Sequence, residues 1–180
     1  MSTQVDIPGY VTGTWVIDAA RSDVSLQIRQ AGFSTVRGRF DEVEGTIVTA
    51  ADPRDSSVTA VISSTSVNTA NKRRDEHLRT KDFLNVESHP TITFTSTGVR
   101  TDGGGVHVDG DLTICGVTRP VTLEVEVEEF GVGRGGRPLV RLSARTEINR
   151  ADHGVSCGPA SAFISKKVAI ALKIEATKQG

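Results

Sequence analysis

Apolar and polar residues alternate with a period of two along most of the chain from Trp15 onward. Successive side chains of an extended strand point to opposite faces, so this pattern indicates strands with one buried and one exposed face. In the run 106–114, for example, Val106, Val108, Leu112 and Ile114 are separated by polar residues. The alternation predicts about nine strands, at residues 24–28, 36–40, 43–47, 58–62, 92–96, 106–114, 121–127, 142–148 and 168–174.

One segment interrupts the alternation. Residues 71–86 are mostly charged and keep only Leu78, Phe83 and Leu84 as apolar anchors. We expect a short helical segment near residues 72–84 that closes one end of the β structure.

The predicted strands are joined by short turn segments, so most neighbours in sequence are expected to form antiparallel hairpins. An antiparallel sheet of this size forms a sandwich or a closed barrel. The alternating stripes contain Val, Ala, Gly, Ser and Thr as well as Phe, and small inward residues leave volume unfilled. A barrel of about eight strands can hold one small ligand in such a volume, so we favour an all-β fold with a single antiparallel eight-stranded barrel.

Composition agrees with strands and excludes several classes of protein. The chain of 180 residues has 22 Val and 20 Thr against 8 Leu, and its 21 basic and 22 acidic residues leave a net charge of −1. Near-neutral charge argues against a nucleic-acid partner. No apolar stretch is long enough for a transmembrane helix, and residues 1–13 lack the basic start and apolar run of a signal peptide. We therefore expect a cytoplasmic protein with reduced thiols.

Three motifs could carry chemistry. Residues 131–136 match G-x-G-x-x-G, but a strand follows them in place of a helix, which favours a hairpin loop. Asp152, His153 and Cys157 are residue types used in nucleophilic catalysis, without a recognisable nucleophile motif around them. His107 and the carboxylates at positions 109 and 111 would share a strand face, and an exposed polar face explains them without a metal. We expect no metal, cofactor or catalytic residue.

Several segments, taken in order along the chain, resemble the YceI-like family. They are Trp15-x-Ile17-Asp18, Ser22-x-Val24, Gly38-x-Phe40, Ser66-Val67-x-Thr69, Arg74-Asp75-x-His77-Leu78, Asp82-Phe83, Pro90-x-Ile92-x-Phe94-x-Ser96, the run 110–121 (GDLTICGVTRPV) and Asn149-Arg150-x-Asp152-x-Gly154. The resemblance covers about residues 15–176. It implies an N-terminal extension at residues 1–13 and a YceI-like domain at residues 14–180.

The resemblance also implies a lipocalin-like barrel whose interior holds a long-chain amphiphilic lipid, such as a polyisoprenoid or an isoprenoid quinone. On this reading the protein binds, stores or carries the lipid and catalyses no reaction. The expected ligand-binding residues are the inward apolar side chains and a polar pair: Leu26, Ile28, Val36, Phe40, Phe83, Ile92, Phe94, Leu112, Ile114, Leu123, Ile148, Asn149, Arg150, Phe163 and Ile170. Asn149 and Arg150 could instead form a structural hydrogen-bond network.

Two alternatives remain open at the level of sequence. The chain could be an enzyme that acts on a small lipophilic substrate through Asp152, His153 or Cys157, which requires these side chains to converge on a pocket. It could also be an interaction module, with a homodimer formed through an exposed strand edge or through the hairpin near Gly133. A transient contact with a membrane is compatible with a lipid ligand.

Overall fold

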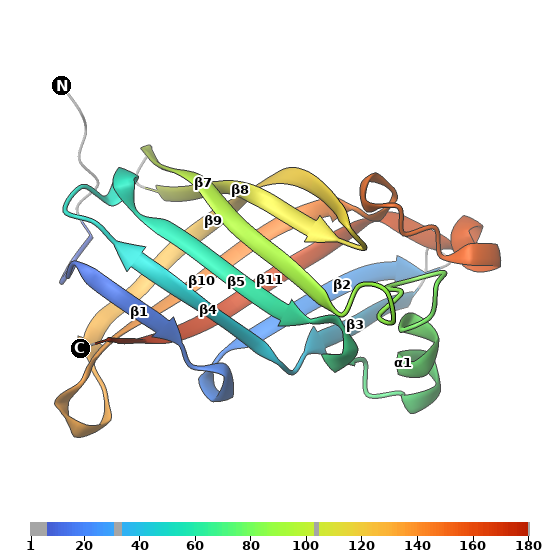
Figure 1. Ribbon diagram of the computed structural model, residues 1–180, viewed down its shortest axis with the longest axis horizontal. Helices are drawn as coiled ribbons and strands as arrows, with labels where there is room; N and C mark the ends of the chain where they lie inside the picture. Colours follow the sequence, from blue (N-terminus) through green and yellow to red (C-terminus); the bar gives the residue numbers. More distant parts are fainter. Residues whose placement is uncertain (1–6, 31–33, 103–104, 180) are drawn as a thin grey trace.

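A computed structural model of the chain describes residues 7–30, 34–102 and 105–179 and shows a sheet closed into a barrel (Figure 1). The strands are β1 (Gly13–Ile17), β2 (Asp23–Gln30), β3 (Ser34–Phe40), β4 (Val43–Thr49), β5 (Ser57–Ser63), β6 (Val67–Asn68), β7 (Thr91–Asp102), β8 (Gly105–Ile114), β9 (Val117–Val132), β10 (Pro138–Asn149) and β11 (Ile164–Lys178). The helix α1 spans Lys72–Leu78, and short 3-10 turns are η1 (Ala19–Arg21), η2 (Pro53–Asp55), η3 (Ser64–Ser66), η4 (Arg134–Gly136), η5 (Arg150–His153) and η6 (Gly158–Phe163).

The eleven strand segments make eight barrel strands. β1 pairs with β4 while β2 pairs with β3, so β1 and β2 are two parts of one bent strand, as are β4 and β3. β5 pairs with β4 and the short β6 pairs with β3, which makes a third bent strand. The remaining strands follow in chain order, and β1 closes the ring by pairing with β11. The predicted antiparallel eight-stranded barrel is confirmed.

Each of the nine predicted segments lies within a strand of the barrel. Two short strands, β1 and β6, were not predicted as separate elements, because each belongs to a longer strand that bends. The helical prediction near residues 72–84 corresponds to α1, which begins after the cap Asn71, whose side chain accepts a hydrogen bond from the backbone N–H of Arg74. Turns, and no second helix, continue from Arg79 toward β7 in this described part of the chain.

The two ends of the barrel are packed differently. At one end Trp15 is fully buried, its ring lies edge-on against Phe130, and Phe130 in turn contacts Tyr10. Trp15 Nε1 donates to Thr49 Oγ1 at 2.9 Å, which fixes the indole. Figure 1 shows α1 at the opposite end, together with the segment between β10 and β11.

Inward glycines let neighbouring side chains fill the barrel, contrary to the expectation that they leave space for a ligand. A Cβ on Gly110 would meet the Phe94 ring, with Cε2 only 2.6 Å away. A Cβ on Gly45 would lie 2.8 Å from Ile17 Cδ1 and 2.5 Å from the carbonyl oxygen of Thr59. The volume that each glycine releases is therefore already occupied by core atoms.

This packing makes Gly110 intolerant of a side chain. We expect Gly110→Ala to lower the free energy of unfolding by about 1–3 kcal/mol, because the added methyl group overpacks Phe94 and the adjacent backbone. Gly98→Ala is the control, since a Cβ there meets no atom within 4 Å, and its effect should be within about 0.5 kcal/mol. Urea unfolding of both variants measures the difference. Equal stabilities would contradict the packing described here.

Candidate ligand-binding cavity

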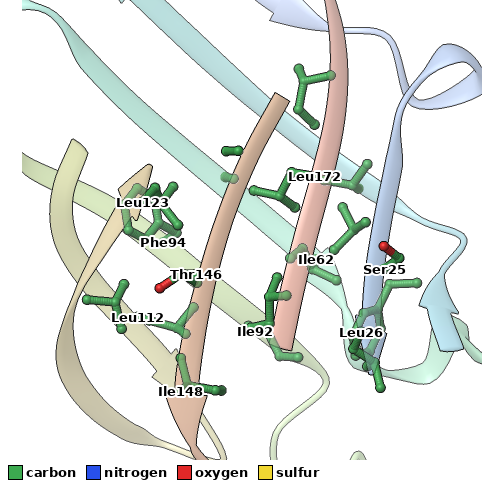
Figure 2. A pocket seen from close by; sticks show the side chains of 18 of the residues that line it. Ser25, Leu26, Ile62, Ile92, Phe94, Leu112, Leu123, Thr146, Ile148 and Leu172 are labelled. Carbon is green, nitrogen blue, oxygen red and sulfur yellow. The ribbon is translucent and has the colours of Figure 1, made fainter. Parts of the chain in front are cut away.

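An apolar cavity of about 470 Å³ runs through the interior of the barrel. Its walls come from the inward side chains of almost every strand, among which Figure 2 shows Leu26, Ile62, Ile92, Phe94, Leu112, Leu123, Ile148 and Leu172. Polar atoms on the wall are few, and Figure 2 shows the hydroxyl groups of Ser25 and Thr146 among them. Pockets that bind small molecules typically have roughly 300–1,000 Å³ and the same mainly apolar lining.

The cavity is long and narrow. On β10 its lining side chains run from Val140 to Ile148, which corresponds to about 20 Å along a barrel axis at ordinary strand rise and tilt. Beyond these, the lining extends to Tyr10 and Phe130 at one end and to Phe83 and Leu84 at the other. A volume of about 470 Å³ spread over this length matches one extended chain better than a compact ring system.

All but two of the residues expected to bind a ligand line this cavity. Those that the structure brings together are Leu26, Ile28, Val36, Phe40, Phe83, Ile92, Phe94, Leu112, Ile114, Leu123, Ile148, Arg150 and Ile170. Phe163 lies at the end of η6 with 64% of its surface exposed, and it is not part of the lining. Asn149 also lies outside the lining, and its side chain accepts a hydrogen bond from the backbone N–H of Ala151, which caps η5.

Arg150 is a buried cation whose donors are used within the protein. Its guanidinium donates to the backbone carbonyls of Val155, Ser161, Ile164 and Ser165 at 2.8–3.2 Å, and only 5% of the residue is exposed. These bonds tie the segment between β10 and β11 into a fixed loop at the end of the cavity. Of the two roles that the sequence left open for Arg150, this geometry supports the structural one.

His153 and Cys157 line the same end of the cavity, while Asp152 does not. Both residues are 2% exposed, whereas Asp152 is on the surface. His153 Nδ1 lies 3.0 Å from the carbonyl oxygen of Val117, and a carbonyl accepts only, so this nitrogen carries the proton. Burial raises the pKa of the Cys157 thiol, which nearby Arg150 only partly offsets. The three groups do not converge, and the thiol is disfavoured as a nucleophile.

Near α1 a buried polar network anchors the helix beside the cavity. The Asp75 carboxylate accepts hydrogen bonds from the backbone N–H and the hydroxyl of Thr69 at 2.8 and 2.6 Å. Arg74, which lines the cavity, donates through Nε to Thr69 Oγ1 and through Nη2 to the Thr69 carbonyl. His77 contributes an edge-on contact with the Phe83 ring. Neither Arg74 nor His77 was among the residues expected at the site.

Other lining residues could have been found from the alternation alone. Five lining residues lie on the same strand faces as residues that were expected to bind the ligand. They are Val106, Val108, Val125, Leu172 and Ile174. Arg74, His77 and Tyr10 carry no such signal, because they reach the cavity from outside the alternating strands, the first two from α1 and Tyr10 from the segment before β1.

The polar strand face considered for a metal is occupied by other contacts. Arg100 donates to both carboxylate oxygens of Asp109 at 2.7 and 2.9 Å, and Thr122 donates to one of them. These hydrogen bonds, first that of Arg100, lower the pKa of Asp109 to about 2. Within the described residues no cluster of three His, Cys, Asp or Glu side chains is arranged to hold a metal ion. The motif at 131–136 covers the end of β9 and η4, within the hairpin connection between β9 and β10.

The closed antiparallel barrel and its elongated apolar cavity define a β-barrel of lipocalin-like architecture. The chain belongs to the YceI-like family, because the model of the YceI-like domain matches residues 15–176. Protein YceI of Escherichia coli O157:H7 is 36% identical over 159 residues, which cover 87% of this chain and 81% of the relative.

Solved structures show the same fold. BcnA of Burkholderia cenocepacia superposes with a TM-score of 0.79 at 24% identity and covers 88% of this chain and 98% of its own. The YceI protein of Campylobacter jejuni gives 0.75 at 25% identity, covering 82% and 88%. A polyisoprenoid binding domain of Saccharophagus degradans, implicated in plant cell wall breakdown, gives 0.70 at 19% identity, covering 94% and 100%. In the part of the chain that the structure describes, no helix could span a membrane.

The structural role of Arg150 is testable by a conservative change. We expect Arg150→Lys to lower the free energy of unfolding by about 2–4 kcal/mol, because one ammonium group cannot reach all the carbonyls that the guanidinium serves. Arg145→Lys on the preceding strand β10 is the control, because its ion pair with Glu124 is exposed and contributes about 0–1 kcal/mol. Chemical unfolding measures both, and an Arg150→Lys protein as stable as the control would refute the role.

Proposed function

We propose that the protein binds, stores or carries one long-chain amphiphilic lipid, such as a polyisoprenoid or an isoprenoid quinone, in the barrel cavity and catalyses no reaction. The observation that carries this proposal is the narrow cavity of about 470 Å³ that runs between the two ends of the barrel with an almost wholly apolar wall. The apolar side chains of this wall can bury an apolar chain along its length, and the wall has few polar groups that could orient a polar substrate.

The energetics fit a chain of moderate length. About fifteen buried CH₂ groups would gain about 12 kcal/mol at about 0.8 kcal/mol each. Association costs an estimated 4–15 kcal/mol, so binding is tight only when most of the chain is inside. The ligand is therefore selected mainly by the length and width of its tail.

The comparisons support the same class of ligand. The Saccharophagus degradans domain is a polyisoprenoid binding domain, and its barrel superposes on nearly the whole of this chain. At 19% identity the likeness establishes the fold, and the apolar cavity of this chain supplies the reason to extend the ligand class. Cytoplasmic location, a homodimer and transient membrane contact stay predictions.

The direct test is to identify what the protein carries. Protein purified under native conditions should release a stoichiometric lipid into organic solvent, and native mass spectrometry should show the same mass bound to the folded chain. Protein stripped of lipid should bind all-trans-retinol, a fluorescent isoprenoid alcohol, with one site per chain. The absence of both a carried lipid and retinol binding would refute the proposal.

Filling the cavity should weaken binding without unfolding the protein. Ala144 is buried on β10 and lines the cavity, so Ala144→Phe shortens the space available to the chain. Displacing two or three CH₂ groups costs about 2 kcal/mol. Retinol affinity should therefore fall by more than about tenfold.

Ala171→Phe is the matched control for this change. Ala171 lies on the neighbouring strand β11, opposite Arg145, and its side chain is exposed. Retinol titration should show an unchanged dissociation constant for this variant, and thermal unfolding should show that both variants fold. Equal affinities of the two variants would place the retinol outside the cavity.

A further inference from the structure

The wall of the barrel has a seam between β9 and β10. The ladder between these strands runs from Val132 opposite Pro138 to Glu124 opposite Arg145 and stops there. Beyond this point β9 extends back to Val117 and β10 continues to Asn149. Within these fully described strands, no pairing joins residues 117–123 of β9 to residues 146–149 of β10.

Both sides of the seam are nevertheless ordered strands. β8 pairs with the whole unpaired part of β9, from Val117 opposite Ile114 onward. β11 pairs with β10 as far as Asn149 opposite Lys167. Each edge of the seam is therefore held from its outer side, and the two edges part as they approach the α1 end.

The sequence of β9 is compatible with an unpaired edge beyond the last ladder pair, Glu124 opposite Arg145. Pro120 lies in the middle of the unpaired stretch, and proline has no N–H to donate to a neighbouring strand. Proline within a sheet is confined to edges and bulges, and Pro120 lies on the edge of β9 that faces the seam.

Side chains connect the seam at each end. At the end of the ladder, Arg145 Nε donates to Glu124 Oε2 at 2.8 Å on the outer surface. At the other end η5 reaches across to β9. There Arg119 Nε donates to the carbonyl oxygen of Asp152 at 3.0 Å, and His153 Nδ1 donates to the Val117 carbonyl at 3.0 Å.

Between these contacts the seam borders directly on the apolar cavity. Val121 and Leu123 on β9, and Thr146 and Ile148 on β10, all line it. Figure 2 shows Leu123 on one side and Thr146 and Ile148 on the other. Two other strands also run past their partners: η2 packs on β7, and Thr69 contacts β3 at Gly38.

From this arrangement we propose that the seam between β9 and β10 is a lateral gate through which a lipid chain enters and leaves the cavity. The inference rests on the proposed binding function. Opening the seam breaks two side-chain hydrogen bonds, those of Arg119 and His153, and no hydrogen bond of a strand ladder. Passage through the opposite end would instead displace Tyr10 and the aromatic pair formed by Trp15 and Phe130.

Cross-linking tests the gate. Thr122→Cys and Glu147→Cys place two exposed thiols on opposite sides of the seam, and a short bis-maleimide joins them after folding. Glu126→Cys with Ser143→Cys is the matched control, because these positions already face each other in the ladder. Mass mapping confirms that each link excludes Cys115 and Cys157.

Stopped-flow fluorescence with retinol gives the readout. We expect the seam link to slow association and release together by about tenfold or more, with little change in the dissociation constant, because a gate changes rates and leaves the bound state intact. The ladder link should change neither rate. Unchanged rates in protein whose seam is linked would overturn the proposal.

A second variant opens the gate without a reagent. Arg119→Ala removes one of the two contacts between η5 and β9 and should speed both association and release. Arg141→Ala, which removes an exposed ion pair with Glu129 across the paired part of the same two strands, is its control. Equal rates for the two variants would also count against the gate. If lipid-free wild-type protein fails to bind retinol at equilibrium, the binding function itself fails, and that titration is made first.

Discussion

The pairing of β1 with both β4 and β11 is the constraint on which the rest of the structure depends. It converts a meander with two free edges into a ring, so most backbone hydrogen bonds of the wall are satisfied within the sheet. Alternating side chains are then sorted into one face that meets solvent and one that meets the interior. Because β1 supplies only a short stretch, the same strand must bend at η1 and continue as β2 on the same edge of β11. The bends in the two following strands keep those strands in register with this one.

A ring of this size leaves more interior than its stripes of side chains fill, and the molecule distributes that excess unevenly. Large side chains occupy the space beside Gly45 and Gly110, while Trp15, Phe130 and Tyr10 pack one end. The remaining volume is concentrated in one elongated cavity. Gly45 and Gly110 therefore do not enlarge the cavity. The polar groups at the α1 end, Arg150 above all, are committed to holding loops, which leaves burial as the main source of affinity.

The sequence predicted the repetitive part of this structure and missed what depends on bends and loops. Alternation located nine strand segments, and most of the residues expected to bind a ligand line the cavity. Phe163 shares the apolar character of those residues, but it lies in η6, where no period fixes its direction. Arg74 and His77 reach the cavity only because the Thr69–Asp75 network positions α1 over the end of the barrel. Contacts of this kind join a loop residue to a helix, and no local sequence pattern records them.

Closure and access impose opposite demands on a barrel of this kind. A complete ladder around the ring would satisfy every backbone group, yet a long apolar chain could then reach the interior only through its packed ends. In this chain, closure of the ring and access to its interior depend on different strands. β1 completes the ring at one position. At another, the ladder between β9 and β10 stops at Glu124 opposite Arg145, and the unpaired edges beyond it are short and are bridged by η5. The seam lies beside the segment that Arg150 makes rigid, so one side of it has a fixed support. A barrel that exchanges a buried chain gains from this arrangement, since motion can be confined to a few residues while the pairing that defines the fold stays intact.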